Sequence, residues 1–372
     1  TTLLYARIRA RAEAGKRSIL LVPEQFTSST EARIYRELGD ALSGMVESYS
    51  FTSLAEHILA VEGGAAVQTL TDAGRAVLVR RALEELQDNV HYYYRHRRSA
   101  AFCQMAAETI DELKSAGLSG QQLQELARDC GSESAKLGEL ALIFQGYESL
   151  LAGTGMDPAD RLELAADRLE AALARDELPD FLREREVFID EFDTFNAPKK
   201  RLMGAMLAAL PAVTVALCED GAPMQPGDLE LFSGAKQVAA QLRQLARKNG
   251  AQVAAPELLR RDLRHKDAPG LAALTELLET GSCTPPESAP ELRLFAAASR
   301  EEEARCAAAA IRRLMRQGVR CGKIAVVCRD ISLYRAAVRY EFRMAEIPLY
   351  CDEPTTPEFS APATAVRALL AL

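Results

Sequence analysis

The chain has 372 residues, of which 48% are hydrophobic and 26% charged, and its formal net charge is −8. This balance is typical of a globular protein, and the length allows about two or three domains, which excludes a disordered or fibrous chain. No apolar stretch approaches the roughly 18 residues of a membrane helix, and the N-terminus lacks the pattern of a secretion signal. We therefore expect a cytoplasmic protein without a membrane partner.

The eight cysteines and four histidines are scattered along the chain, with no C-x-x-C pair and no cluster at ligand spacing. We expect reduced thiols and no zinc or iron site within these residues. The acidic balance argues against a surface coated with positive charge for nucleic acid. It is compatible with one local basic channel, because salt screens distant charges.

The first part of the chain predicts a helix and then the order strand, helix, strand, helix. Residues 1–14 have helical spacing without a capping residue at the start, and the apolar run Ser18–Val22 predicts a buried parallel strand. Val46–Ser50 predicts a second strand and Thr52–Val61 a helix. This order is typical of a doubly wound sheet.

Two segments have the S-x-x-E spacing of a capping box, in which Ser and Glu satisfy free amides at a helix start. Ser28 and Glu31 form the first pair, and Ser299 and Glu302 form the second. We expect a helix to begin at each serine.

A long helical region interrupts the predicted sheet. Residues 70–184 are rich in Ala, Leu, Glu and Arg at helical spacing and contain no convincing strand. Strands resume at Val187–Asp190 and Val213–Leu217, with a helix at Lys199–Leu210 between them. The sheet is therefore expected to be completed after a helical insertion.

The last part of the chain predicts a second α/β unit after a linker. Residues 256–290 contain Pro, Gly, Ser and mixed charge, with a short helix at Leu271–Leu278. The segments expected beyond the linker are strands at Glu291–Phe295, Lys323–Cys328 and Ile347–Tyr350, and helices after Ser299 and at Leu333–Met344.

These patterns divide the chain into domains. Residues 1–69 and 185–255 are expected to form a first α/β domain that is split by a helical insertion at 70–184. A linker at 256–290 then leads to part of a second α/β domain at 291–372.

The strongest local signal for chemistry is the apolar run Val187–Phe192, which contains the adjacent carboxylates Asp190 and Glu191. At the carboxyl end of a parallel strand, Asp190 can bind the hydrated Mg²⁺ of a nucleotide, while Glu191 orients or deprotonates the attacking water. The alternative is a strand that simply enters a polar loop, since such short matches are common.

A nucleotide site of this type also needs backbone amides and a lysine around the phosphates, usually from G-x-x-x-x-G-K-S/T. The sequence has no such motif, and Lys114, which precedes Ser115, lies in a helical run and is interpreted as structural. A helix followed by the strand Ser18–Val22 is the order expected directly after a P-loop. We therefore expect the loop upstream, with Thr1 supplying a hydroxyl to Mg²⁺; a ragged start is the alternative.

Residues 91–98 combine three tyrosines with arginines and histidines. This composition suits phosphate contact together with base stacking. The favoured interpretation is nevertheless a solvated loop before a helix.

Several segments, in the same order along the chain, resemble the N-terminal region of the AddB family. Ile324–Asp330, continued by Tyr334 and Ile347–Pro348, also resembles motif IV of UvrD-like superfamily 1 helicases. The other matching segments are Leu21–Thr27 with Glu31, Ser50–Ala55, Phe188–Phe195, which resembles the second helicase motif, and Ala297–Glu303.

The resemblance implies a RecA-like P-loop NTPase fold of the superfamily 1 helicase type, with part of a second RecA-like domain. It implies a partnership with an AddA-type helicase–nuclease subunit, and action on single- and double-stranded DNA during resection of double-strand breaks. ATP and Mg²⁺ are implied for the full-length protein. A nuclease domain bounded by iron–sulfur cysteines is implied beyond this chain, so the chain alone is expected to be inactive, without P-loop, motifs V and VI or nuclease.

The resemblance also assigns roles to individual residues. Gln25 and Thr27 follow the first strand, where related helicases touch single-stranded DNA, and Phe51 and Ser53 follow the next strand. Phe51 could stack on a base and Gln25 could read base edges. The alternative is a core phenylalanine and a helix-capping threonine. Arg329 is implied to face the nucleotide from the second domain and to stabilise charge on the γ-phosphate.

Two departures from the family pattern leave hydrolysis open. Asp190 and Glu191 are closer to an active helicase motif than the Asp-Gly often seen in the family, whereas Cys218–Gly221 only loosely resembles the third helicase motif. A free-standing superfamily 1 DNA helicase and a catalytically silent scaffold that binds DNA and a partner are the alternative functions.

Overall fold

The computed structural model describes residues 1–64, 68–221, 231–259, 264–351 and 361–370. The chain divides into two compact units, residues 1–261 and residues 262–372. None of the described helices is both long and apolar enough to span a membrane.

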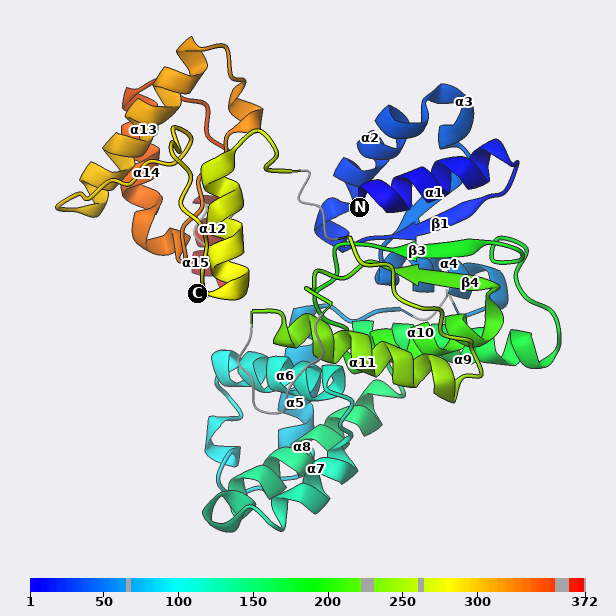
Figure 1. The fold of residues 1–372 in the computed structure, drawn as a ribbon. Coiled ribbons are helices and arrows are strands. Elements are labelled where there is room, and N and C mark those ends of the chain that lie inside the picture. The colour runs from blue at the N-terminus through cyan, green and yellow to red at the C-terminus, as the bar shows by residue number, and fades with distance from the viewer. Residues whose placement is uncertain (65–67, 222–230, 260–263, 352–360, 371–372) are drawn as a thin grey trace. The chain divides into compact units, whose positions relative to one another are not determined.

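The described part of the first unit contains a four-stranded parallel sheet with the strand order β2-β1-β3-β4 (Figure 1). Its strands are β1 Ser18–Leu21, β2 Val46–Tyr49, β3 Glu186–Ile189 and β4 Ala212–Val215. Each strand lies inside its predicted segment or begins one residue before it. The prediction of one parallel sheet, built from strands before and after the helical region, is confirmed. Leu21 lies opposite both Tyr49 and Ile189, so the carboxyl ends of these strands are level.

Helices cover both faces of the sheet, as the alternation of strand side chains requires. On one face, Leu20 and Phe188 pack in a buried cluster with α1 Thr2–Glu13 and α2 Thr27–Leu38. The short helix α3 Asp40–Ser43 lies on the same side (Figure 1).

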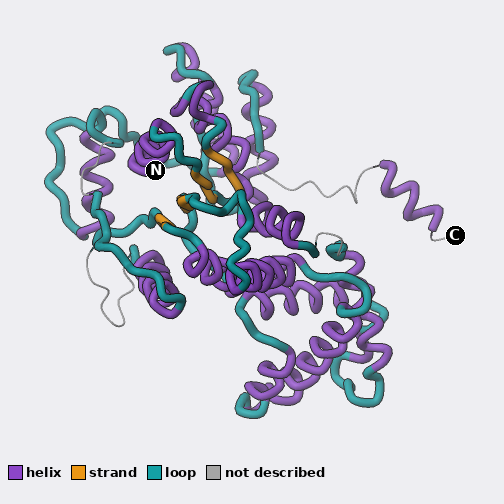
Figure 2. Tube along the Cα trace, turned by 90° about the vertical axis from the view of Figure 1, so that its right-hand side faces the viewer, coloured by secondary structure: helices purple, strands orange, loops and turns teal. Residues whose placement is uncertain are grey.

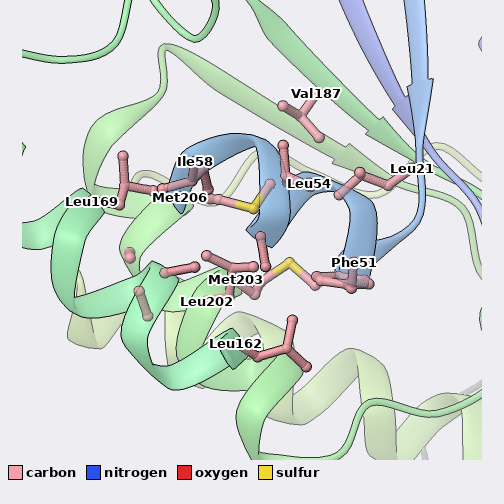
Figure 3. Close-up of a cluster of buried hydrophobic side chains, with 14 of the residues drawn as sticks. Leu21, Phe51, Leu54, Ile58, Leu162, Leu169, Val187, Leu202, Met203 and Met206 are labelled. Atoms are coloured by element: carbon pink, nitrogen blue, oxygen red, sulfur yellow. The ribbon is translucent and has the colours of Figure 1, made fainter. Parts of the chain in front are cut away.

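The opposite face of the sheet holds the larger core. Leu21 and Val187 from β1 and β3 meet apolar side chains from three helices there, as Figure 3 shows. These helices are α4 Phe51–Glu62, α9 Pro158–Ala174 and α10 Ala197–Ala209, with α11 Ser233–Lys248 packed beside α10.

Helices α5 to α8 have a core of their own, separate from the core under the sheet. Their bounds are α5 Asp72–Glu85, α6 Ala100–Ser115, α7 Gly120–Ala127 and α8 Ser134–Leu151, and they are the helical body at the bottom of Figures 1 and 2. Helix α9 also lies within residues 70–184, yet Leu162 and Leu169 of α9 are buried in the core under the sheet.

The two ends of the α5–α8 body meet in one short parallel bridge between Thr69 and Met156. The amide of Leu70 donates to the Met156 carbonyl at 3.1 Å. The chain thus enters and leaves the inserted helices at nearly the same place.

Lys114 ties the inserted helices to the start of α9. Its Nζ donates to Asp157 at 2.9 Å and to Asp160 at 2.8 Å, and the Tyr147 hydroxyl donates to Asp157 at 2.6 Å. Asp157 and Tyr147 are each 1% exposed. This buried network agrees with the structural interpretation of Lys114.

The second unit is helical in the part that the structure describes. Helices α13 Arg300–Arg316 and α14 Ile331–Met344 pack through Ala308, Ile311 and Phe342. The other helices are α12 Pro269–Thr280 and α15 Ala361–Leu370, and short 3₁₀ turns occur in both units at Glu24–Phe26, Tyr94–His96, Gly131–Glu133 and Cys321–Lys323.

The predicted strands of the second unit are wrong. Glu291–Phe295, Lys323–Cys328 and Ile347–Tyr350 form no ladder with any described residue. Leu294 is 99% exposed and Val327 89% exposed. An apolar run with strand propensity becomes a strand only where a neighbouring strand accepts its hydrogen bonds, and the sequence pattern does not supply that neighbour.

The first predicted capping box is wrong and the second is confirmed in part. Helix α2 begins at Thr27, directly after a 3₁₀ turn, so Ser28 lies inside the helix rather than at its cap. Ser299 caps α13 by accepting from the Glu302 amide at 3.3 Å. The Glu302 carboxylate accepts from the amide of Ala298 at 2.9 Å, whereas a capping box predicts the amide of Ser299 as the donor.

Candidate functional site at the carboxyl edge of the sheet

Because the strands are parallel, the residues that follow them gather at one edge of the sheet. Helix α1 spans the sheet in the reverse direction. Near its end, Arg11 pairs with Glu186 at 3.0 Å, at the amino end of β3. The first turn of α1 therefore lies at the carboxyl edge, close to Asp190.

Asp190 directly follows β3 and is 6% exposed. Its amide donates to the Leu21 carbonyl at 3.1 Å, and its Oδ1 accepts from the amide of Glu191 at 3.1 Å. Glu191 itself is exposed and has a φ of 65°, a left-handed conformation that costs a non-glycine residue on the order of 1 kcal/mol. The chain thus turns sharply after a buried carboxylate and presents the next one to solvent.

Tyr5, in the first turn of α1, responds to both carboxylates. Burial raises the pKa of the Tyr5 phenol to about 12; Arg33 opposes this rise, and Asp190 and Glu191 add to it. The Arg33 guanidinium carbon lies 4.8 Å from the centre of the Tyr5 ring. The start of α1 and the end of β3 therefore share one electrostatic environment.

Thr1 is the N-cap residue of α1 and its side chain makes no capping hydrogen bond. No group of three or more His, Cys, Asp or Glu side chains that could hold a metal occurs in the described ranges. Mg²⁺ bound to a nucleotide keeps waters and phosphate oxygens and needs only one or two protein ligands. The Asp190 carboxylate is suited to supply one of these protein ligands. The Thr1 hydroxyl lies at the start of the neighbouring helix.

Gln25 and Thr27 follow β1 at the same edge. Gln25 is exposed within the 3₁₀ turn Glu24–Phe26, and Phe26 beside it is 36% exposed. The Thr27 hydroxyl donates to the Glu24 carbonyl at 3.0 Å. Gln25 is therefore presented to solvent, whereas Thr27 closes the turn that carries it.

Phe51 lies in the core. It is 2% exposed and makes edge-to-face contacts with Phe192 at 5.3 Å and Phe195 at 5.9 Å between ring centres. Neither face of the ring is open to a base in this structure, which matches the core alternative. Phe51 is therefore a core residue in this structure.

Ser53 closes the first turn of α4. Its hydroxyl oxygen accepts from the amide of Ser50 at 2.8 Å, while the Ser50 hydroxyl oxygen accepts from the amide of Ser53 at 3.1 Å. The S-x-x-E spacing does not predict this reciprocal cap, because Ser53 stands where Glu or Gln is usual. Ser53 therefore has a structural role whether or not it touches DNA.

Sequence reasoning also missed the cations at this edge. Arg33 covers Tyr5, and the Lys199 ammonium lies 5.6 Å from the ring centre of Phe192. No sequence pattern indicated either contact, because each joins residues of different elements.

Arg329 belongs to the second unit. It is exposed and precedes Asp330, which caps α14 by accepting from the Ser332 amide at 2.9 Å. The expected role toward a nucleotide stays a prediction.

A family model described as ADDB, N-terminal, matches residues 1–275. The chain belongs to the AddB family. This match confirms the resemblance predicted from the sequence motifs. The matched residues include those at the carboxyl edge of the sheet in the first unit.

Curated relatives of this AddB-family chain are named as the B subunit of an ATP-dependent helicase/deoxyribonuclease. The one from Desulforudis audaxviator is 34% identical over 356 residues, which cover 92% of this chain and 30% of the relative. The one from Moorella thermoacetica is 32% identical over 357 residues, covering 93% and 30%. The one from Geobacillus thermodenitrificans is 28% identical over 389 aligned positions, covering 100% and 32%. The chain thus spans about 30% of the length of these relatives.

Proposed function

We propose that this chain is the N-terminal part of the B subunit of an AddAB-type ATP-dependent helicase–nuclease, which unwinds and resects double-strand DNA breaks for recombinational repair. In this proposal the chain contacts DNA and an AddA-type partner subunit. The names of its relatives support the assignment to a helicase/deoxyribonuclease.

The observation that carries the proposal is the hydrogen bond from the Asp190 amide to the Leu21 carbonyl at 3.1 Å. It joins strands from both sides of the inserted helices and brings Asp190 to the edge where the exposed Gln25 follows β1. In open α/β sheets, ligands bind at the carboxyl ends of the strands. This arrangement supports a RecA-like motor domain of the superfamily 1 type, with nucleotide and DNA contacts at one edge.

The proposed chemistry assigns separate roles to the edge residues. A bound nucleotide with its Mg²⁺ would supply the phosphoanhydride and the charge-neutralising metal. Asp190 and the hydroxyl of Thr1 would hold the hydrated metal, and Glu191, exposed beside Asp190, would orient a water. Arg329 would stabilise phosphate charge in the full-length protein. Gln25 and Thr27 would contact single-stranded DNA.

Binding of single-stranded DNA by the full-length protein tests the DNA role. Gln25→Ala is expected to weaken binding by about fivefold to about a hundredfold, the range for a lost side-chain contact to a base edge. Gln121→Ala, an exposed glutamine on α7, is the matched control. Equal affinities for the two variants and the wild type would reject the DNA contact at this edge.

The same preparation separates the alternatives. A protein that binds DNA and its partner but no nucleotide is a silent scaffold. A protein that unwinds DNA without any partner is a free-standing helicase, and that result would reject the AddAB assignment.

A further inference from the structure

The aromatic and basic segment 91–98, between α5 and α6, is anchored rather than loose. The Glu139 carboxylate of α8 accepts from three consecutive amides, those of His91 at 3.0 Å, Tyr92 at 2.8 Å and Tyr93 at 3.1 Å. Charge-assisted bonds of this kind are the stronger ones in proteins. The segment is a solvent-exposed loop before a helix, as the sequence indicated, but the backbone that carries its tyrosines is held in place.

The anchored backbone presents one tyrosine to solvent. Tyr93 stacks on Phe102 of α6, with ring centres 5.5 Å apart and an interplanar angle of 23°. Tyr92 packs edge-to-face against Tyr93 at 4.9 Å and is 44% exposed. Tyr93 thus supports Tyr92 from the protein side and leaves part of its ring open.

Three arginines of the same segment lie near its tyrosines or face solvent. The guanidinium carbon of Arg95 lies 5.8 Å from the Tyr92 ring centre, and that of Arg97 lies 3.9 Å from the ring of Tyr94. Arg98 is exposed. In the described parts of the chain, no carboxylate comes within ion-pair distance of these arginines.

Other arginines of the same helical body are neutralised. Arg80 pairs with Glu84 at 3.1 Å and Arg81 with Glu85 at 3.0 Å, both on α5. Arg95, Arg97 and Arg98 thus form no ion pair with a described carboxylate, although neighbouring arginines of the same body have local partners.

We propose that Tyr92, Arg95, Arg97 and Arg98, together called the Tyr92 surface, bind single-stranded DNA. A base stacks on the open part of the Tyr92 ring and the arginines contact the flanking phosphates. Stacking on an aromatic side chain requires an unpaired base, so a single strand fits this surface better than a duplex. The contact lies outside the sheet edge and rests on the proposed function only for the identity of the nucleic acid.

The test is binding of fluorescein-labelled oligothymidine to the full-length protein over a range of salt concentrations. Tyr92→Ala is expected to weaken binding by about fivefold to about a hundredfold, as loss of one base–aromatic stack does. Arg98→Ala is expected to make the slope of log affinity against log salt shallower by about 0.7, the value for one phosphate contact in a single strand.

Matched controls are Tyr340→Ala, which removes a tyrosine that is 62% exposed, and Arg81→Ala, which removes a paired arginine. Both should leave affinity and salt slope near wild type. Photo-cross-linking with halogenated uracil in the oligonucleotide should label Tyr92 in the wild type.

Wild-type affinity and salt slope in both Tyr92→Ala and Arg98→Ala would overturn the proposal, as would a loss confined to duplex DNA. If Gln25→Ala weakens binding while these variants do not, the Tyr92 surface fails and the proposed function stands. If the wild-type protein binds no DNA, the proposed function fails and the Tyr92 surface fails with it.

Discussion

The amide of Asp190 donates a hydrogen bond of 3.1 Å to the carbonyl of Leu21, although the inserted helices separate the two residues along the chain. The bond continues the ladder between β1 and β3 by one residue beyond Ile189. It holds the backbone of a buried carboxylate at the sheet edge. Fold and candidate site therefore depend on the same pairing of strands.

The carboxylate of Asp190 is expected to matter for Mg²⁺-dependent nucleotide binding. Asp190→Asn in the full-length protein should lower affinity for Mg²⁺–ATP by at least about tenfold, because a charge-assisted metal contact is lost. Asp193→Asn, which changes an exposed carboxylate of the same loop, is the control. Titration calorimetry gives the comparison, and equal affinities for both variants would remove Asp190 from the site.

Loss of the Lys114 ammonium is expected to destabilise the inserted helices strongly. Lys114→Met leaves Asp157, which is 1% exposed, without its cation, and breaking a buried pair in this way costs about 3 to 5 kcal/mol. Lys136→Met removes a surface pair with Glu133 and should leave stability near wild type, because an exposed ion pair contributes little. Urea unfolding measures both, and similar costs would contradict the buried network.

Variants of Phe51 distinguish a role in the core from a contact with DNA. Phe51→Ala should cost about 3 to 5 kcal/mol of unfolding free energy, since a large side chain leaves the core. Phe51→Leu keeps most of the volume and should keep single-stranded DNA affinity near wild type. A folded Phe51→Leu variant with strongly reduced affinity would restore the base-stacking role.

Acid should release the anchored segment 91–98. Burial raises the pKa of Glu139, but the hydrogen bonds from the amides of Tyr92, His91 and Tyr93 outweigh it, and the net pKa lies below the ordinary value. A carboxylate with a lowered pKa stabilises the fold above its unfolded pKa, and this contribution disappears as pH falls through the folded pKa.

Hydrogen exchange at these amides, corrected for intrinsic rates, should therefore show constant protection from neutral pH down to the ordinary glutamate range and loss below it. In the Glu139→Gln variant these amides should be less protected at neutral pH, and their protection should show no such acid transition. Protection in the wild type that is independent of pH would mean that Glu139 is not the anchor.

The first unit could be predicted because its strands have clear local signals. Ser18–Leu21 and Glu186–Ile189 lie in short apolar runs, as buried parallel strands require, and the runs end at Pro23 and Asp190. Their pairing across the inserted helices followed from the alternation of strands and helices. Asp190 was placed correctly for the same reason, because it comes directly after such a strand.

The remaining differences arise from tertiary context. Val327 has strand propensity but lies 89% exposed with no described neighbour to pair with. Phe51 follows a strand as a DNA-facing residue would, yet the rings of Phe192 and Phe195 enclose it. The anchoring of Tyr92 by Glu139 joins residues far apart in the sequence, and no local pattern contains it.

The central claim is that residues before and after the inserted helices form one sheet domain. A double-mutant cycle on Arg11 of α1 and Glu186 of β3, which pair at 3.0 Å with side chains 22% and 18% exposed, tests it most directly. Arg11→Met and Glu186→Gln should each destabilise the full-length protein, and the pair should show a coupling energy of roughly 0.5 to 1 kcal/mol. Effects that add without coupling would contradict the claim.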